Sequence, residues 1–425
     1  MKMMPLAQPR SAQRSREPDM PRSLLLVVCL LALASVSNTN SFGVVFVPAA
    51  EGIGLDVAAL GGLRTIENLS SIIAALIVAP LIDRFPRKWI LLSGFGCGLV
   101  GVVILITLNN VPGTIIFFVL NGAAMMQIFG SLLAIPSDYI GGRQLNRLMG
   151  LIIGSIAFAS ILVAPAVGNV AERLGWQAGM MVAAGVTLVA FLLSALVVPN
   201  YRLPKSADSD LGFIQRYKAI LGRKPLLIML ASNLLRFAQL AAILTFLSTV
   251  MIQRYDLSLG VIGFIMSGVG VMFFLSSVLS GVLLHWLKTF RILVWGGVIA
   301  VILLALMLIN ELPLVLMIPA VFVFQIVIAA QESTGTIAVI RLAGHSRGAA
   351  MSWNELAGGT GALVGIGSGS IGLALGGVTG LGIALTSVAF LATIVSFIAL
   401  YVSGYQDEPD EPGRPVAASA HSSSG

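Results

Sequence analysis

The chain has 425 residues, of which 57% are hydrophobic and only 10% are charged, with a formal net charge of +7. Its mean hydropathy is +0.98. Because soluble domains carry about 25% charged residues, this composition excludes an ordinary soluble protein. It predicts an integral membrane protein of the all-α class, since a helix satisfies its backbone hydrogen bonds without water.

Long apolar runs between polar residues give the expected membrane spans. A helix of roughly 20 residues crosses an apolar core about 30 Å thick. Twelve runs reach that length, and they fall at 23–49, 57–81, 89–109, 113–136, 148–169, 177–198, 225–252, 259–284, 290–310, 313–338, 349–370 and 376–402. We therefore expect twelve transmembrane helices with mostly short connections.

Lysine and arginine residues accumulate in cytoplasmic loops. With the N-terminus placed inside, all but four of the 25 fall in cytoplasmic segments; the exceptions are Arg173 and Arg254 in outer loops and Arg64 and Arg236 within spans. The net charge then follows from topology, and no nucleic-acid partner is expected. The one N-x-S/T sequon, at Asn68, lies within a span, which fits a bacterial inner membrane with both termini in the cytoplasm.

The longest internal loop, 199–224, divides the chain into two halves of six spans, 23–198 and 225–402. A basic tail, 1–22, precedes them, and a tail rich in Pro, Ser and acidic residues, 403–425, is predicted to be disordered. Charged loop positions recur in the second half at an offset of about 200 residues. Two parallel six-helix halves with a site between them are typical of one class of secondary transporters.

The loop after the second span reads APLIDRFPRKWIL, residues 79–91. It resembles the loop motif of the major facilitator superfamily, G-x-L-a-D-R-x-G-R-K-x-x-L. The pairs Asp83-Arg84 and Arg87-Lys88 match at the family's spacing. The resemblance implies the fold of that superfamily, with two pseudo-symmetric halves.

The match is incomplete in both halves. Ala79 and Pro86 replace the two glycines of the motif. The second-half copy, 281–293, keeps Gly281 but has His285 in place of the acid. The glycine replacements concern the packing of helix against loop, and degeneration of the second-half copy, including loss of its acid, is usual in the family.

A carboxylate can cap the positive end of another helix, and an arginine one turn further on can bridge to a second acid. By family resemblance, Asp83 would face the start of the eleventh span at 349–353, and Arg87 would reach Asp138 at the inner end of the fourth. These contacts would form a latch that holds the cytoplasmic side shut. The alternative is a loop that only obeys the topology rule, which leaves the acid at Asp83 unexplained.

A second resemblance lies in the fifth span, at 164–169, which reads APAVGN. Pro165 and Gly168 match the G-P-x-x-G-G motif of the superfamily's antiporters, whereas Ala164 and Asn169 do not. Proline bends a helix and glycine allows close approach, which suits a helix between the two halves. The resemblance implies the drug and metabolite:proton antiporter group.

Ionisable residues inside spans are the remaining functional signal, since each costs at least about 2.5–3.5 kcal/mol on insertion scales. Glu67 lies about 15 Å into the second span and Arg236 about 16 Å into the seventh. Arg64 shares a face with Glu67, and this pair has an equally good structural interpretation. Glu355 lies about 9 Å into the eleventh span, whereas Glu332 is expected to snorkel at the inner boundary of the tenth.

Neutral polar residues occupy the first, fourth, seventh and tenth spans, which line the cavity in the superfamily. They also fit ordinary hydrogen bonds between helices. The set is Asn38, Asn40, Asn121, Gln127, Asn233, Gln239 and Gln325.

Together these features predict a monomeric secondary transporter that works by alternating access and exports a small organic molecule in exchange for protons. Glu67 is the first candidate for the proton carrier and Glu355 the second. An uptake permease, or a receptor or scaffold on the same fold, is the alternative. No nucleophile with a base and no metal-ligand spacing is present, so neither an enzyme nor a cofactor is predicted. The expected partners are a small solute, a proton and lipid.

Overall fold

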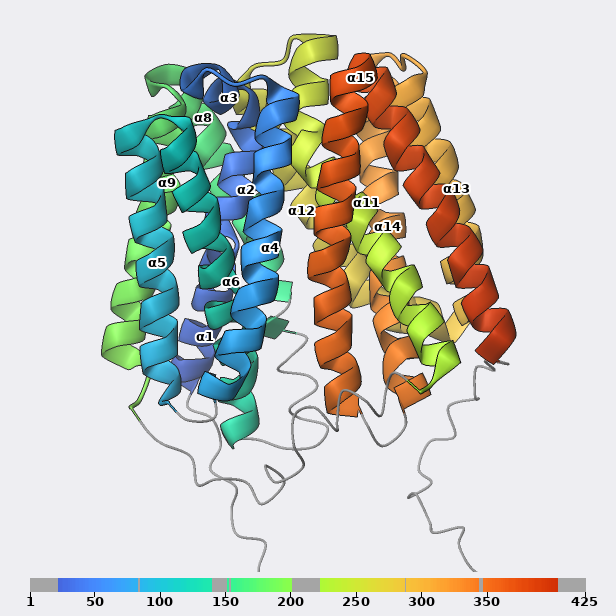
Figure 1. The fold of residues 1–425 in the computed structure, drawn as a ribbon, viewed down its shortest axis with the longest axis horizontal. Coiled ribbons are helices and arrows are strands. Elements are labelled where there is room, and N and C mark those ends of the chain that lie inside the picture. Colours follow the sequence, from blue (N-terminus) through green and yellow to red (C-terminus); the bar gives the residue numbers. More distant parts are fainter. Residues whose placement is uncertain are drawn as a thin grey trace, which may run out of the picture.

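The computed structural model describes residues 22–82, 85–139, 151–152, 154–200, 222–286, 288–343 and 347–403. All regular structure in these ranges is helical, which confirms the all-α prediction. The predicted tails and most of the predicted 199–224 linker lie outside the described residues. Figure 1 shows the helices running side by side as one bundle.

The first half of the chain begins with three short helices that follow one another. Breaks at Val36 and Val45 separate them. Near the first break, the hydroxyls of Ser35 and Ser37 donate to backbone carbonyls at 2.6 and 3.0 Å and so offer the backbone an alternative to regular helix. The helices of this half are α1 (Arg22–Ser35), α2 (Ser37–Val44), α3 (Phe46–Ile53), α4 (Val57–Ile82), α5 (Arg87–Leu108), α6 (Val111–Tyr139), the π-helix η1 (Ala159–Val163), α8 (Ala164–Leu174) and α9 (Trp176–Val197).

The second half of the chain contains longer helices and two further π-helical turns. These elements are α11 (Lys224–Tyr255), α12 (Leu259–Trp286), η3 (Arg291–Trp295), α13 (Gly296–Leu304), η4 (Ala305–Ile309), α14 (Leu314–Ala343) and α15 (Arg347–Ser403).

The described residues contain ten helical segments that are long and apolar enough to cross a membrane. One of them, Trp353–Val402, is two spans, because the backbone of α15 leaves the helical region at Gly376 and Gly377. Gly377 has φ +58°, which favours glycine. The 26 residues of α4 form the remaining span, bent by 103° from α3. The twelve predicted spans are thus accounted for.

Several helices extend past their predicted ends, and two of them, the fifth and tenth spans, do so by five residues. The fifth span continues to Leu174 rather than stopping at 169, and the tenth continues to Ala343 rather than 338. In both cases the last turns carry an arginine, Arg173 and Arg341, which suits a helix C-terminus as well as a loop. The longer tenth span places its acidic residue deeper than the sequence indicated.

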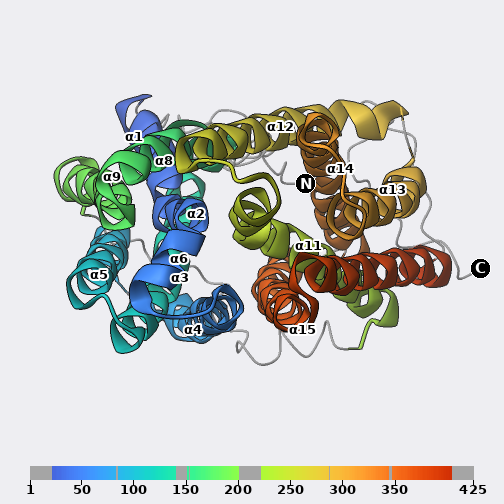
Figure 2. The same cartoon turned by 90° about the horizontal axis from the view of Figure 1, so that it is seen from above.

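The two halves stand beside each other, with α12 packed along α8 and α4 packed along α15 (Figure 2). We call the end where α3 leads into α4 and α11 into α12 the closed end; it is at the top of Figure 1. The opposite end, where α1 begins and α15 ends, is called the open end.

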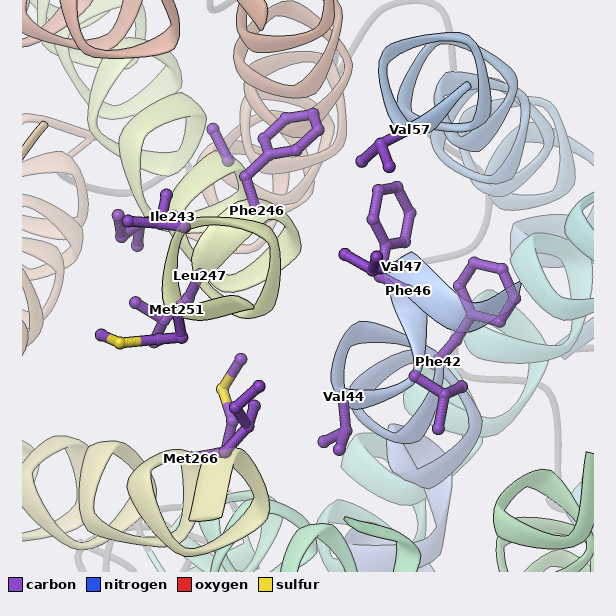
Figure 3. Packing of buried hydrophobic residues seen from close by; sticks show 14 of the residues in the cluster. Phe42, Val44, Phe46, Val47, Val57, Ile243, Phe246, Leu247, Met251 and Met266 are labelled. Atoms are coloured by element: carbon purple, nitrogen blue, oxygen red, sulfur yellow. The ribbon is translucent and has the colours of Figure 1, made fainter. Parts of the chain in front are cut away.

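The buried hydrophobic residues form three clusters that explain these names. The largest cluster draws on both halves, with Phe42 and Phe46 from one and Phe246 and Met266 from the other (Figure 3). A second cluster belongs to the first half alone, and a third, around Leu226 and neighbouring residues, belongs to the second half alone. The described hydrophobic core is therefore continuous between the halves toward the closed end and divided toward the open end.

Candidate functional site

Aromatic rings seal the closed end between the halves. The ring of Phe46 meets that of Phe246 edge to face, with centroids 5.8 Å apart, and Phe42 packs on Phe46 in the same way at 5.8 Å. Nearby, the hydroxyl of Ser248 donates to the carbonyl of Gly43 at 2.7 Å. These contacts join α2 and α3 to α11 and exclude water from this region.

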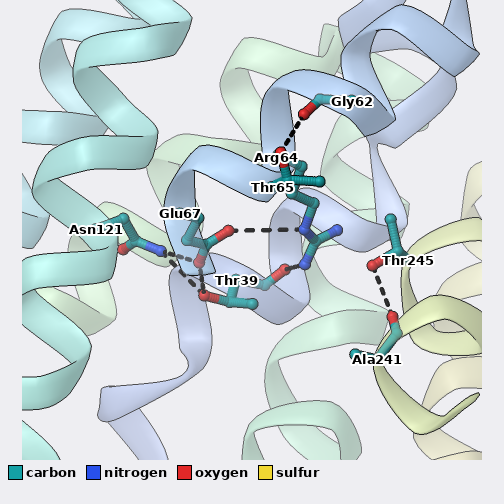
Figure 4. A network of polar contacts seen from close by, with 8 residues as sticks. All are labelled: Thr39, Gly62, Arg64, Thr65, Glu67, Asn121, Ala241 and Thr245. Atoms are coloured by element: carbon teal, nitrogen blue, oxygen red, sulfur yellow. Dashed lines mark hydrogen bonds and ion pairs between the residues drawn. The ribbon is translucent and has the colours of Figure 1, made fainter. Parts of the chain in front are cut away.

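A buried polar network lies directly beside the aromatic seal (Figure 4). Arg64 Nε and Glu67 Oε2 are 3.6 Å apart, one turn apart on α4, and both side chains are 6% exposed. Glu67 Oε1 also accepts hydrogen bonds from Thr39 Oγ1 at 2.6 Å and from Asn121 Nδ2 at 2.8 Å. The predicted same-face pair is therefore present, and two hydrogen-bond donors and one cation, from three helices, surround one carboxylate.

Arg64 connects this network to the seal. Its Nη2 donates to the Thr39 carbonyl at 3.2 Å, and its guanidinium carbon lies 5.9 Å from the centroid of Phe46 and 6.0 Å from that of Phe42. Cations attract aromatic faces at such distances. Its Nη1 is buried and has no hydrogen-bond partner. The guanidinium thus links the first-half network to the rings that meet the second half.

Asn38 extends the same network toward the interior of the first half. Its Nδ2 donates to Asn121 Oδ1 at 3.3 Å, and its Oδ1 accepts from Thr187 Oγ1 at 3.0 Å. Asn38 is 5% exposed. Its polar groups therefore hold helices α2, α6 and α9 together, which is the hydrogen-bonding alternative that the sequence left open.

The second half has its own polar cluster, centred on Arg236 of α11, which is 1% exposed. Its Nη1 donates to Ser232 Oγ at 2.5 Å and to Ser396 Oγ of α15 at 2.8 Å, and its Nη2 donates to Asn233 Oδ1. Asn233 Nδ2 in turn donates to Asn354 Oδ1 at 2.6 Å. Neutral oxygens thus hold this cation, and its Nε has no hydrogen-bond partner.

Glu332 of α14 lies near this cation. A Cβ built at Gly335, one turn after Glu332, would collide with Arg236 Nη2, so the guanidinium lies against that face of α14. Glu332 is only 8% exposed, and neither of its carboxylate oxygens has a hydrogen-bond partner. The expectation that Glu332 snorkels at the boundary is wrong, because α14 runs eleven residues beyond it, about 16 Å.

Glu355 occupies a different environment on the eleventh span. It precedes Gly359 by four residues and so shares its helix face. A Cβ built at Gly359 would lie 3.2 Å from Ile72 of α4, which shows that this face points toward the first half. Glu355 is exposed there, whereas Asn354 beside it is buried. Glu355 therefore faces the space between the halves.

The fifth and eighth spans make a close backbone contact between the halves. A Cβ built at Gly168 would collide with the Leu259 carbonyl, and one at Gly263 would lie 2.7 Å from the Ala164 carbonyl and 3.0 Å from Pro165 Cα. The residues of the antiporter-like motif, Pro165 and Gly168, thus lie where backbone meets backbone.

Glu172 completes this contact at the closed end. Its Oε2 accepts a hydrogen bond from the backbone N–H of Gly260, in the first turn of α12, at 2.7 Å. The sequence analysis missed Glu172 because it placed the residue in an outer loop. The sequence does contain a signal, an acidic residue one turn beyond the 164–169 motif. If the helix continues past the motif, this residue lies at the interface between the halves.

The structure describes some of the other predicted site residues, whereas others lie outside the described ranges. Gln127 Oε1 accepts from Ser93 Oγ at 2.5 Å, and Gln239 and Gln325 are each 2% exposed. In the predicted latch, Arg87 and Lys88 are half-buried at the start of α5. Asp83, Arg84 and the side chain of Asp138 lie outside the described residues, so the latch remains a prediction.

Solved membrane transporters share this fold. A variant of the nucleoside transporter NupG matches with a TM-score of 0.74 at 14% identity, covering 89% of this chain and 99% of that one, and NupG itself matches with 0.71 at 13%, covering 90% and 100%. A bacterial homolog of the human lysosomal transporter Spinster, in an inward-facing and unoccupied conformation, matches with 0.68 at 14%, covering 90% and 95%. At such identities the likeness shows the fold alone.

No curated protein sequence matches the chain significantly. The family model described as Major Facilitator Superfamily, however, matches residues 28–366. This match covers most of the chain and agrees with the loop motif and the fold. The chain therefore belongs to the major facilitator superfamily.

Proposed function

We propose that this transporter of the major facilitator superfamily exports a small organic molecule in exchange for protons, by alternating access. The observation that carries the mechanism is the division of the core: one hydrophobic cluster crosses both halves toward the closed end, and each half has its own cluster toward the other. Halves joined at one end and separate at the other are able to rock about a site between them.

The distribution of basic residues orients this arrangement. The predicted cytoplasmic segments, which include both termini and the longest loop, hold 21 of the 25 arginines and lysines. This distribution supports an open end that faces the cytoplasm of a bacterial cell, with the inner membrane around the bundle. The conformation described here is then the inward-open one. In the outward-open conformation, the predicted latch of Asp83 and Arg87 would hold the cytoplasmic side shut.

Export is favoured over uptake by the span-5 motif. Pro165 and Gly168 lie at a close backbone contact between the halves, where an antiporter-type helix would act. An uptake permease would use the same halves with the opposite coupling direction, and a receptor on this fold would move no solute. The chain is proposed to act as a monomer, with the small solute, a proton and lipid as its partners.

The coupling acid is the point at which sequence and geometry diverge. The sequence favours Glu67, near the midplane, with Glu355 second. In the structure Glu67 accepts two hydrogen bonds and pairs with Arg64, so its oxygens are already occupied. We therefore assign Arg64 and Glu67 to closure of the outer side. The coupling proton then binds to a different carboxylate.

The test uses inverted membrane vesicles that contain the full chain, with a pH-sensitive dye inside. A panel of amphiphilic drugs and metabolites is added while a respiratory substrate maintains the proton gradient. The proposal expects at least one compound to release protons from the vesicles and to accumulate within them. Vesicles without the protein set the background. Solute entry that leaves the dye unchanged would contradict proton exchange, and proton-driven extrusion from the vesicles would favour the uptake permease.

A further inference from the structure

We infer that Glu332, together with Arg236 and Glu355, forms a proton-binding site within the second half. This inference rests on the proposed function and names the group that couples solute transport to protons. The site lies on three helices, α11, α14 and α15, which pack on one another. It is separate from the Arg64 and Glu67 network of the first half.

The Glu332 carboxyl group is buried without a hydrogen-bond partner. The side chain is more than nine-tenths buried, and no hydrogen-bond partner reaches either oxygen. A buried charge without a partner is unfavourable, and an added proton removes that charge.

The charges near that group favour one bound proton. Arg236 lies against the face of α14 that carries Glu332, and Glu355 belongs to α15, which packs on α14. One cation and two acids leave a net charge of −1 when both acids are ionised, and one proton neutralises the site. Of the other elements packed on α14, α13 and η4 carry no ionisable residue, Arg291 of η3 is exposed, and His285 lies in the last turn of α12.

Access to water and a response to protonation complete the site. Glu355 is exposed between the halves, so it can exchange protons with water, and it lies on α15, which packs on the helix that carries Glu332. When Glu332 loses its proton, Arg236 gains an anionic partner. Moving toward it, the guanidinium would leave Ser396 and Asn233, which tie α11 to α15. The protonation state thus acts on the contact between the seventh and eleventh spans.

The decisive experiment follows the carboxyl group itself and needs no substrate. Purified full-length protein in lipid is titrated from acid to alkaline pH while infrared spectroscopy records the C=O stretch of protonated carboxyl groups. We expect a titrating band that disappears in Glu332→Gln and persists in Glu67→Gln. Gly335→Ala, which displaces the Arg236 guanidinium, should shift its midpoint. Gly358→Ala, whose Cβ would lie an ordinary 3.4 Å from Phe237, is the matched control and should leave it unchanged.

Each outcome decides the inference. A band that survives Glu332→Gln, or one that is lost in Glu67→Gln instead, overturns it. If the infrared band titrates as expected while no vesicle assay detects solute flux, that result would support the proton-binding site and contradict the proposed export function. If Glu332→Gln fails to fold, Gly335→Ala still decides, because an unmoved midpoint would show that Arg236 does not act on the titrating group.

Discussion

The carboxylate of Glu172 accepts a hydrogen bond from the N–H of Gly260 at 2.7 Å, and the two residues belong to opposite halves of the molecule. Gly260 lies in the first turn of α12, where backbone N–H groups lack helical partners and negative charge is favourable. A single side chain of the fifth span therefore caps the eighth. This outer contact corresponds in kind to the cytoplasmic latch predicted around Asp83, at the other end of the bundle.

Removing the charge of Glu172 should loosen the closed end. A charge at a helix N-terminus contributes about 0.3–2 kcal/mol, so Glu172→Gln should raise the population open to the outside roughly two- to thirtyfold. The measurement is maleimide labelling of Leu247→Cys, now buried in the seal, in a background without Cys29 and Cys97. Glu51→Gln, an exposed acid at the same end, is the control. Equal labelling in both variants would show that the cap does not hold the halves together.

A methyl group at Gly168 should keep the halves from closing. Its Cβ would occupy the position of the Leu259 carbonyl, so Gly168→Ala should lower transport strongly and increase Leu247→Cys labelling. Gly185→Ala, where nothing lies within 4 Å of the added Cβ, should leave both unchanged. Full transport by Gly168→Ala would mean that this backbone contact is dispensable.

Glu67→Gln should destabilise the protein rather than uncouple it. Breaking a buried ion pair by removing one charge costs about 3–5 kcal/mol, since the partner stays buried. We expect a lower midpoint of thermal unfolding in detergent, with partial recovery in Arg64→Met/Glu67→Gln. The sequence-based hypothesis predicts the opposite pattern, normal stability with loss of proton-driven accumulation. Measuring unfolding and accumulation on the same variant separates the two.

The cytoplasmic latch gives a prediction that rests on sequence alone. Asp83→Asn should lower transport sharply at an unchanged protein level and should raise the cytoplasmic accessibility of cysteines placed between the halves. Arginine and lysine at 84, 87 and 88 remain, so topology is preserved in this variant. Unaltered transport and accessibility would reduce the stretch to a topology signal.

How much the sequence predicted depended on the kind of signal. Apolar runs gave every span, because the thickness of the bilayer fixes their length, and the i, i+3 spacing gave the Arg64 and Glu67 pair. Glu172 and Glu332 were misjudged because both depend on where a helix ends, and the charged last turns of α8 and α14 resemble loops. Two partners of Arg236, Ser232 and Asn233, lie one turn away on the same helix, whereas Ser396 is 160 residues distant, which no local pattern encodes.

The central claim is that the two halves open alternately at the two ends. Spin labels on Glu51 and Glu311 report on the closed end, and labels on Trp89 and Tyr401 report on the open end; all four positions are exposed and each pair joins the two halves. Distance distributions are recorded for the full chain in lipid nanodiscs at acid and alkaline pH, in a background without Cys29 and Cys97. The account predicts reciprocal changes, with the first pair moving apart as the second moves together. Two pairs that keep a single distance at every pH, or that widen and narrow in step, would contradict it.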